Sequence, residues 1–391
     1  MGMIVISFDG VKDTELKKMA SLPDVYPNIA KFKAESVFMG GVKTVFVSNT
    51  YPTHTTIATG KLPKDHGVIS NYINTKNGRR WAQLASHIKA KTIWDAAFEK
   101  GLTVASILWP VTCGANIKWH MPEAHIHGKE NQIVENLRYG SFLFQLQAFL
   151  RYGKKLKGFT PLGLDDFSTS VVCDLLKKSS PDLMLIHLLA YDSTSHRYGS
   201  QSEALGDARK SLDASLGKIL EVADSLNDSA DVVDSAGVVD SGNYAVLVFS
   251  DHGHIDVFET INLREIFGEN VYEQCGGSAF FNFAPHENRE SFLTQIENYP
   301  WFGRFLTDEE MKDSGYSNLA AYGIAAKKSY CFVDEGQHKS NHGYPTDYED
   351  YNAFYALRDK HSEHFLQTEQ THGDLRDITA IISKVLKLDI V

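Results

Sequence analysis

The chain has 391 residues, of which 43% are hydrophobic and 11% aromatic, enough for one large domain or two ordinary ones. Its formal charge of −10 argues against a general polyanion-binding surface, so no polymeric nucleic acid is expected as a partner. Apolar runs such as SFLFQLQAFL are much shorter than the roughly 20 residues of a membrane-spanning helix, so no membrane span is predicted.

Three strand-like runs end on an aspartate. The runs are MIVISFD, LMLIHLLAYD and AVLVFSD, and they stop at Asp9, Asp192 and Asp251. A fourth, β-branched run begins at Thr44 and leads to Thr50, where a helix-like segment starts. The crevice beyond the carboxyl ends of parallel strands is where open α/β sheets bind ligands, so we expect these four residues to meet there.

The remaining segments alternate between helix and strand as far as residue 256. Helices are predicted over 12–19, 27–34, 92–100, 165–178 and 203–226, and a buried strand over 103–109. Residues 113–163 are expected to elaborate the sheet edge and to include an aromatic helix over 137–152. Residues 353–357 predict a further strand and 374–388 a closing helix, so the pattern indicates a mostly parallel sheet with helices on its faces.

Histidines accompany the strand-end aspartates. Asp192 and His196 are four residues apart and therefore neighbours on one helical turn. His252 directly follows Asp251, and His342 lies in a later Asn-His-Gly sequence. Histidine and carboxylate together favour zinc or manganese over magnesium, which takes nearly all its ligands from oxygen.

Six short motifs in this order resemble the nucleotide pyrophosphatase/phosphodiesterase branch of the alkaline phosphatase superfamily. They are FDG at 8–10, NTYPTH at 49–54, TGKLPKDHG at 59–67, DSTSH at 192–196, SDHG at 250–253 and NHG at 341–343. The resemblance implies an α/β, alkaline-phosphatase-like three-layer sandwich, in which helices cover both faces of a mostly parallel central sheet. It also implies a catalytic core of residues 1–257 and 339–391 and a small inserted cap of residues 258–338.

The resemblance further implies two metal ions, expected to be Zn²⁺ with Mn²⁺ as the other candidate. The ligands of one ion would be Asp192, His196 and His342, and those of the other Asp9, Asp251, His252 and the oxygen of Thr50. Two such ions can hold the entering and leaving oxygens of a displacement at phosphorus. A hydroxyl needs this kind of activation, and Thr50 is the predicted nucleophile.

Other residues near the motifs receive supporting roles. The helix start after Thr50 is expected to offer backbone N–H groups to the phosphoryl oxygens. In the resembled family an asparagine also donates to these oxygens, and here it corresponds to Asn71. His54, His66 and His254 are expected to support the site rather than to bind metal. Irregular spacing argues against a separate metal site at His120, His125 and His127. Candidates for the border of the substrate pocket are these three histidines, Tyr51, Trp109 and Pro110.

The predicted function is that of a metal-dependent phosphodiesterase or nucleotide pyrophosphatase-like hydrolase, which forms a covalent intermediate on Thr50. Its substrate would be a small phosphoester such as a nucleotide. A sulfatase is disfavoured because Thr50 cannot become formylglycine and His54 replaces the sulfatase arginine. A non-catalytic metal-binding module is disfavoured because the nucleophile and every ligand are present.

Two hydrolases of the same superfamily remain as alternatives. A phosphomonoesterase needs an arginine or another cation for the more highly charged terminal phosphate, and the motifs contain none. A phosphonate hydrolase, which splits a carbon–phosphorus bond, would be favoured by lysines around the site. Lys43, Lys61 and Lys64 cannot be placed from the sequence, so this alternative stays open.

Compartment and thiol state follow from what the sequence contains. The N-terminus enters a strand-like run without a basic segment followed by an apolar one. We therefore expect a cytoplasmic protein, or a secreted or periplasmic one if a leader has been removed. Four widely spaced cysteines favour reduced thiols over disulfides. The sequence does not indicate an oligomeric state.

Overall fold

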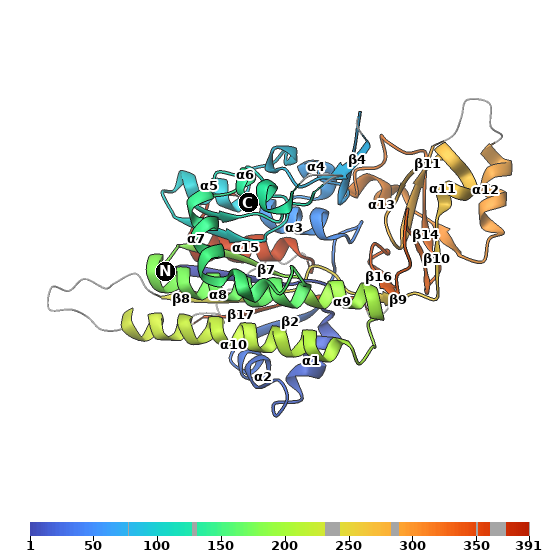
Figure 1. Cartoon of the computed structure of the whole chain (residues 1–391). Coiled ribbons are helices and arrows are strands. Elements are labelled where there is room, and N and C mark those ends of the chain that lie inside the picture. Colours follow the sequence, from blue (N-terminus) through green and yellow to red (C-terminus); the bar gives the residue numbers. More distant parts are fainter. Residues whose placement is uncertain are drawn as a thin grey trace.

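A seven-stranded sheet lies at the centre of the computed structural model, which describes residues 1–76, 78–126, 131–230, 243–282, 289–348, 351–359 and 373–390 (Figure 1). Its strands, in spatial order, are β2 (Val37–Val42), β17 (Ala353–Arg358), β8 (Tyr244–Phe249), β1 (Gly2–Phe8), β7 (Leu183–Leu188), β5 (Val104–Ile107) and β6 (Trp119–Met121). The β8-β1-β7-β5-β6 neighbours all pair in parallel, whereas β17 is antiparallel to both β2 and β8. The predicted mostly parallel sheet is confirmed.

Alternate side chains of the central strands face two separate apolar layers. Ile4 and Ile6 of β1 belong to one buried cluster, and Met3 and Val5 to another. Helices α1 (Asp13–Ala20), α2 (Pro27–Ala34), α8 (Pro161–Ser179) and α10 (Leu205–Ala230) pack in the first cluster. Helices α3 (Thr50–Thr59), α5 (Ile93–Glu99) and α15 (Arg376–Leu386) pack in the second. This period-2 division gives the three-layer α/β sandwich that the sequence predicts.

One predicted strand is absent. The β-branched run from Thr44 to Asn49 forms no strand, because β2 ends earlier, at Val42, and an irregular segment leads from it to α3. Phe46 and Val47 of this segment are buried in a cluster with Phe280 and Tyr316. The apolar side chains of the run therefore pack against the second sheet described below, instead of extending the central one.

The segment before α8 also differs from its prediction. The expected single helix over 137–152 is two helices, α6 (Gln132–Tyr139) and α7 (Phe142–Tyr152). The break coincides with a close approach of two backbone segments, since a Cβ at Gly140 would lie 2.5 Å from the carbonyl oxygen of His120. The Ser141 hydroxyl also accepts a hydrogen bond from His120 N–H (3.1 Å). Residues 119–121 contribute β6, the edge strand itself.

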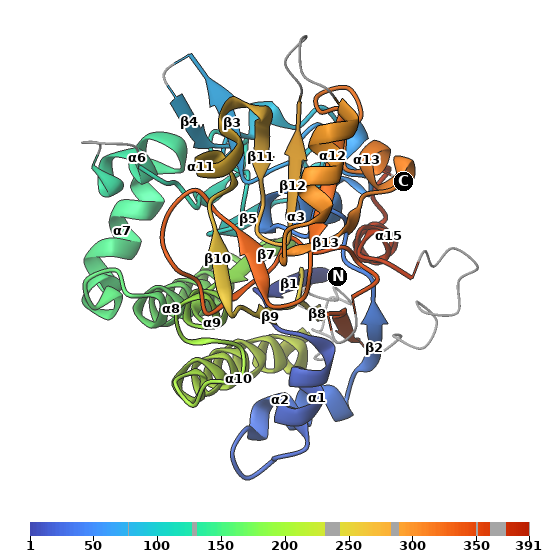
Figure 2. The same cartoon turned by 90° about the vertical axis from the view of Figure 1, so that its right-hand side faces the viewer.

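A second sheet lies beyond the carboxyl ends of the central strands (Figures 1 and 2). It is antiparallel, in the order β11 (Val271–Gln274), β12 (Ser278–Phe281), β14 (Tyr322–Ala326) and β13 (Phe302–Phe305). The other elements of this region are β10 (Glu259–Ile261), α11 (Leu263–Phe267), α12 (Arg289–Glu297), α13 (Asp308–Asp313) and β15 (Tyr330–Phe332). All of them lie within residues 258–338, and the assignment of that range to a cap domain remains our proposal.

Shorter elements complete the fold. Between the sheets lie α4 (Pro63–His66), the hairpin β3 (Tyr72–Thr75) and β4 (Gly78–Trp81), α9 (Ala190–Tyr198), and the pair β9 (Ile255–Asp256) and β16 (Ser340–Asn341). The four cysteines are free thiols. Across the part of the chain that the structure describes, no helix combines the length and apolar character needed to cross a bilayer.

Candidate metal centre and substrate cavity

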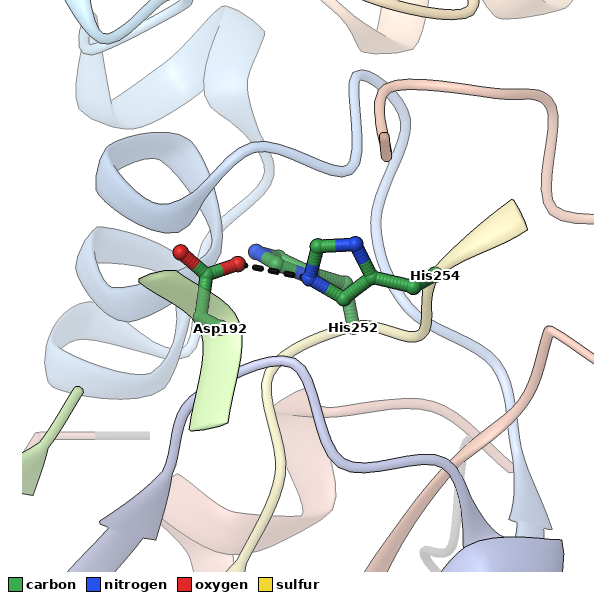
Figure 3. Close-up of side chains that lie close together, drawn as sticks. All are labelled: Asp192, His252 and His254. Carbon is green, nitrogen blue, oxygen red and sulfur yellow. Dashed lines mark hydrogen bonds and ion pairs between the residues drawn. The ribbon is translucent and has the colours of Figure 1, made fainter. Parts of the chain in front are cut away.

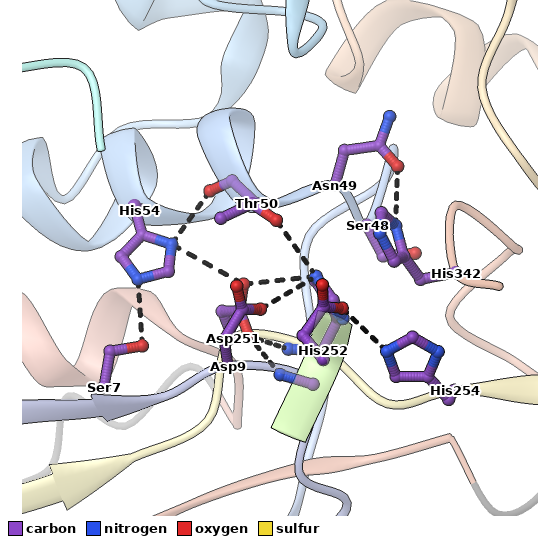
Figure 4. A network of polar contacts seen from close by, with 12 residues as sticks. Ser7, Asp9, Ser48, Asn49, Thr50, His54, Asp251, His252, His254 and His342 are labelled. Atoms are coloured by element: carbon purple, nitrogen blue, oxygen red, sulfur yellow. Dashed lines mark hydrogen bonds and ion pairs between the residues drawn. The ribbon is translucent and has the colours of Figure 1, made fainter. Parts of the chain in front are cut away.

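The residues that the sequence places at strand ends come together in one buried cluster (Figure 4). Asp9 directly follows β1, Asp192 lies in the first turn of α9 after β7, and Asp251 follows β8. Thr50 begins α3 at the same edge of the sheet. Among the described residues, two groups in the cluster match the two predicted ligand sets, and within each group the ligating atoms lie within 4.8 Å of one another.

The inner triad, as we name it, consists of Asp9, Asp251 and His252. His252 Nε2 lies 3.5 Å from Asp9 Oδ1 and 3.2 Å from Asp251 Oδ2. Neither of these carboxylate oxygens has a hydrogen-bond partner among the described residues, although both are buried. Buried polar atoms are rarely left without a partner, so the arrangement fits a cation held between the three side chains.

Thr50 joins the inner triad from the side of α3. Its hydroxyl oxygen lies 3.4 Å from His252 Nε2, which is the nitrogen that faces Asp9 and Asp251. A cation bound by the triad would therefore lie close to the Thr50 oxygen. The structure brings together all four residues assigned to this ion from the sequence.

The outer triad consists of Asp192, His196 and His342. His196 Nε2 lies 3.4 Å from Asp192 Oδ1, one helical turn away on α9. His342 follows β16 and reaches the same point from the segment that returns from the second sheet. Although burial raises it, the pKa of Asp192 is held well below its usual value by the imidazoles of His196 and His254.

The histidines of both triads are oriented for metal binding. Each donates its Nδ1–H to an oxygen: His196 to the Ser340 carbonyl (3.0 Å), His252 to the Gly253 carbonyl (3.3 Å), and His342 to Asn49 Oδ1 (2.9 Å). Donation from Nδ1 leaves the Nε2 lone pair for a metal ion, and such partners are typical of metal-binding histidines. The donor set therefore fits two cations of the Zn²⁺ or Mn²⁺ type.

Electrostatics at the inner triad also require a counter-charge. Burial and the neighbouring carboxylates of Asp251 and Asp192 raise the pKa of Asp9 well above its usual value. Several acidic groups in one desolvated cluster repel one another when ionised. Divalent cations would remove this repulsion, and charged carboxylates are the form that binds them.

His254 lies within the cluster but has no free ring nitrogen. Its Nε2 is 2.7 Å from Asp192 Oδ1 (Figure 3), and its Nδ1 is 3.0 Å from the Ser340 hydroxyl. It also forms a group of potential ligands with Asp192 and His252. Because both nitrogens are already hydrogen-bonded, we keep the supporting role expected for His254.

His54 and His66 lie behind the site. His54 Nδ1 donates to the Thr50 carbonyl (2.9 Å), and its Nε2 contacts the Ser7 hydroxyl (2.9 Å). His66 accepts a hydrogen bond from the Val68 N–H (3.1 Å) and contacts the Thr56 hydroxyl (3.1 Å). Burial lowers the pKa of His54 to about 4 and that of His66 to about 3. Both rings are therefore neutral at pH 7 and fix the start and the middle of α3.

Asn71 is bound to the helix that carries Thr50. Its Oδ1 accepts a hydrogen bond from the Tyr51 N–H (2.9 Å). The third residue of α3, Pro52, has no N–H, so the helix start offers fewer donors than the sequence suggests. The Asn71 side-chain NH₂ makes no hydrogen bond to any described residue, and Asn71 lines the cavity beside Thr50. The Asn71 side-chain NH₂ can therefore donate to a bound ligand, whereas the Tyr51 N–H is already used by Asn71 Oδ1.

A cavity of about 1020 Å³ opens from the two triads toward the second sheet. One wall is aromatic: Trp81 stacks on His125 with ring centroids 4.0 Å apart and lies 5.5 Å from Tyr51 and 4.4 Å from Tyr72. Glu123 lies at the same wall, and its Oε2 is buried without a hydrogen-bond partner among the described residues. The wall can thus stack on a planar group and accept its N–H.

The predicted pocket residues divide into two sets. Tyr51 and His125 line the cavity. Trp109 and His120 do not, because Trp109 packs edge-on against His54 (centroids 5.1 Å apart) and His120 contacts the buried Thr112 hydroxyl (3.1 Å). Pro110 also lies away from the lining, and His127 falls outside the described residues.

Three residues that contact the predicted metal ligands were not identified from the sequence. His187 contacts Asp9 Oδ2 through Nε2 (2.9 Å), Asn49 accepts from His342, and His338 Nδ1 lies 3.0 Å from His196 Nδ1. Asn49 and His187 do lie within or beside runs that the sequence singles out. Their partners are 293 and 178 residues away, so no local pattern connects them.

The β3-β4 hairpin is fastened to the second sheet beside the cavity. The guanidinium of Arg79 forms ion pairs with both Glu273 and Asp334. Asp334 also accepts from Arg264 Nε (2.9 Å) and Gln274 Nε2 (2.7 Å). Burial raises the pKa of Glu273, whose side chain is 5% exposed. The cluster therefore joins the hairpin to the second sheet by paired charges.

Comparisons with known proteins identify the family of the chain. The family described as type I phosphodiesterase / nucleotide pyrophosphatase matches residues 3–381. Venom phosphodiesterase 2 of Crotalus adamanteus is 27% identical over 226 residues, which cover 56% of this chain and 24% of the relative. A bis(5'-adenosyl)-triphosphatase of Pongo abelii is 21% identical over 88% of this chain and 69% of its own. The chain matches only about a quarter of the length of the venom enzyme.

Solved structures share the fold. Murine ectonucleotide pyrophosphatase / phosphodiesterase 5, in an inactive form in complex with AMP, has a TM-score of 0.69 and 16% identity, covering 100% of this chain and 96% of its own. Phosphonoacetate hydrolase of Sinorhizobium meliloti, in complex with phosphonoformate, has a TM-score of 0.66 and 13% identity, covering 98% and 95%. At these identities the likeness concerns the architecture alone.

Proposed function

Because the chain belongs to the type I phosphodiesterase / nucleotide pyrophosphatase family, we propose that it hydrolyses phosphodiesters at a two-metal site, with Thr50 as the nucleophile. One observation carries the proposal. The Thr50 oxygen lies beside a triad whose two buried carboxylate oxygens lack partners among the described residues, and a second triad adjoins it. Two divalent ions there would lower the pKa of the Thr50 hydroxyl and neutralise charge on the phosphoryl group.

In this proposal the chain's own residues hold the reacting groups in line. The Thr50 oxygen forms a bond to phosphorus while the bond to the leaving oxygen breaks, and water then cleaves the threonine ester. Asn71 donates its side-chain N–H to a phosphoryl oxygen, because its Oδ1 is already occupied by Tyr51 N–H. His54 fixes the backbone of Thr50 through the carbonyl oxygen and thereby the direction of the nucleophile.

We further propose a nucleotide-like substrate. The wall of Tyr72, Trp81 and His125, backed by the buried ring of Tyr51, offers aromatic surface for a planar base, and stacking on such side chains is worth about 1–3 kcal/mol per base. The unpartnered oxygen of Glu123 can accept an N–H from the edge of the base. AMP in the complex of the structural neighbour is a ligand of that protein, and it agrees in kind with this proposal.

The phosphonate and monoester alternatives are less well supported. No lysine is among the described residues that line the cavity: the Lys64 side chain pairs with Asp313, and Lys43 lies away from the lining, where its backbone forms a β-bridge with Asp374. The lining arginines, Arg79 and Arg264, are engaged by Glu273 and Asp334. Glu123 would also repel the carboxylate of a phosphonoacetate-like substrate. The cavity therefore suits a diester with a single negative charge.

A substrate panel tests the proposal. Bis-p-nitrophenyl phosphate, p-nitrophenyl phosphate and phosphonoacetate are compared in the untreated, the chelator-treated and the Zn²⁺-restored protein. We expect the diester to turn over fastest, with loss on chelation and recovery with Zn²⁺. Faster turnover of phosphonoacetate or of the monoester would overturn the assignment.

The nucleotide part has its own test. The p-nitrophenyl ester of thymidine 5'-monophosphate should have a higher kcat/KM than bis-p-nitrophenyl phosphate. Trp81→Ala should abolish this advantage, by about 5- to 150-fold if one stacking contact is lost, and leave the smaller diester little affected. Equal losses for both substrates would show that Trp81 does not contact the base.

A further inference from the structure

Helix α7 presents most of its large apolar side chains outward. Leu143 and Leu150 are 68% and 75% exposed, and Phe142, Leu146 and Phe149 are also exposed. The buried positions hold Gln145 and Ala148, while Phe144 and Tyr152 pack partly buried against the core. A surface helix normally turns most of its apolar side chains toward the core, whereas α7 leaves five of its large ones exposed. We call the side chains of Phe142, Leu143, Leu146, Phe149 and Leu150 the α7 face.

Neighbouring elements extend this apolar surface toward the cavity. Ile133 and Val134 of α6 are 40% and 57% exposed, and Phe159 is 43% exposed. Phe159 also lines the cavity, together with Gln132 of α6. Helices α6 and α7 lie at one side of the molecule, next to α8 (Figure 2). The α7 face thus continues toward the cavity opening.

Charges are segregated in the same segment. Between residues 136 and 164 the sequence holds five Lys and Arg residues and no Asp or Glu, although the whole chain has a formal charge of −10. Four of the cations, Arg151, Lys154, Lys155 and Lys157, follow the exposed leucines directly. An apolar helix face bordered by Lys and Arg is typical of helices that lie in a membrane interface.

Acids of α8 neutralise this cluster only in part. Asp174 pairs with both Arg151 (2.8 Å) and Lys178 (2.6 Å), and Asp166 lies near Lys155 and Lys218. Each acid therefore faces two cations. Lys154 and Lys157 are exposed and form no ion pair with any described residue. A positive charge remains beside the α7 face.

We propose that the α7 face docks on an anionic lipid surface, with its leucines and phenylalanines in the interface and Lys154 and Lys157 at the headgroups. An interfacial site of this kind needs no membrane-spanning helix. A second copy of the chain fits less well. A symmetric contact would place the same cationic cluster on both sides, where like charges repel.

Vesicle sedimentation tests the proposal. The protein is mixed with vesicles of phosphatidylcholine alone, or of phosphatidylcholine with phosphatidylglycerol, at low and at high salt. We expect binding to the anionic vesicles at low salt, and weaker binding at high salt or on the neutral vesicles. Equal binding to both vesicle types, or binding to neither, would overturn the proposal.

Two paired variants separate the contributions. Lys154→Gln/Lys157→Gln should weaken partitioning onto anionic vesicles by about 30-fold, because each Lys near the surface contributes comparably. Leu143→Ser/Leu150→Ser should weaken binding at both salt concentrations. The matched controls are Lys327→Gln/Lys328→Gln and Leu319→Ser, which change exposed residues elsewhere and should bind as the unchanged protein does.

Two further measurements test whether the variants are folded and whether the α7 face binds a second copy of the chain. Turnover of bis-p-nitrophenyl phosphate should be the same in every variant, because no substituted residue lines the cavity, and this reports a correct fold. Analytical ultracentrifugation tests the competing occupant. If the protein is a dimer that Leu143→Ser/Leu150→Ser converts to a monomer, and vesicles bind none of the proteins, the face is a self-association surface and the proposal is wrong.

Discussion

The inner and outer triads contain similar ligands but differ in what holds them. Asp251 and His252 are fully buried, whereas the side chains of Asp192 and His196 are 14% and 21% exposed. The inner ligands follow β1 and β8, two neighbouring strands of the central sheet. The outer ligands come from α9 and from the segment after β16, whose one partner among the described strands is the short strand β9.

This difference predicts unequal metal retention. A ligand set anchored to central strands keeps its geometry as long as the sheet is folded. The outer set also depends on how the chain returns from the second sheet, and local opening is easier where fewer contacts hold the backbone. We therefore expect the inner triad to bind its ion more tightly than the outer triad binds its own.

Removing the nucleophile should have the largest effect. Thr50→Ala is expected to lower kcat for bis-p-nitrophenyl phosphate by at least about 10³-fold, because nucleophile and metals act as a unit. Bound metal, measured by atomic emission, should be nearly unchanged, since both triads keep their carboxylates and imidazoles. Thr50→Ser, which keeps the hydroxyl, is the control. Full activity of the alanine variant would rule out the covalent step.

Neutralising one carboxylate in each triad should separate the two ions. Asp251→Asn and Asp192→Asn each remove a ligand charge, so each should lose one ion per chain and at least about 100-fold in activity. With Asp192→Asn the retained ion should be the slower to exchange with added chelator. The same exchange rate in both variants would contradict the inequality of the triads.

Residues behind the ligands should have intermediate effects. His187→Gln removes the imidazole that contacts Asp9, and Asn49→Ala removes the acceptor for His342 Nδ1–H. Loss of such partners typically costs about 10- to 100-fold in metal affinity. Metal titration should show the loss at the inner site for His187→Gln and at the outer site for Asn49→Ala. A loss at the opposite site would break the assignment.

Acid is expected to destabilise the fold itself, which limits the pH range in which metal binding by the two triads can be compared. Burial lowers the pKa of His66 to about 3 and that of His120 to about 4, and neither contacts a triad. An unfolded histidine titrates near about 6.5, so the unfolded state binds more protons below that pH and stability falls as the pH drops toward 4. Near pH 5 each should lower the free energy of unfolding by about 2 kcal/mol.

Urea unfolding at neutral pH and near pH 5 measures this effect. Replacing His66 or His120 by Gln should reduce the pH dependence, whatever it does to the stability at neutral pH. An unchanged pH dependence in both variants would show that other groups dominate. Loss of metal in acid can then be read separately from loss of the fold.

The sequence predicted best those features that local patterns determine. Asp9, Asp192 and Asp251 follow short apolar runs typical of buried strands, and strand direction then brings them together. The helix predicted over 27–34 has the observed bounds of α2, since Pro27 fixes its start. The run from Thr44 was misread because its apolar side chains serve the second sheet, which no local pattern reveals.

The other features that could not be predicted from the sequence share one cause. The break between α6 and α7 depends on a backbone approach between Gly140 and His120, twenty residues apart in the chain. The support of His342 by Asn49 and the displacement of Trp109 from the cavity wall also arise from packing between distant segments. Periodicity and motif spacing carry no information on such contacts.

The ion pairs of Arg79 with Glu273 and Asp334 have a consequence for how ligands are chosen. Separating the hairpin from the second sheet would leave the buried Glu273 carboxylate without its ion-pair partner, which is energetically costly. The two parts should thus move as one rigid body, and the cavity keeps its shape with or without a guest. Ligands are then selected by their fit to a preformed cavity. A molecule of the wrong shape fails to bind, instead of being rejected after a conformational closure.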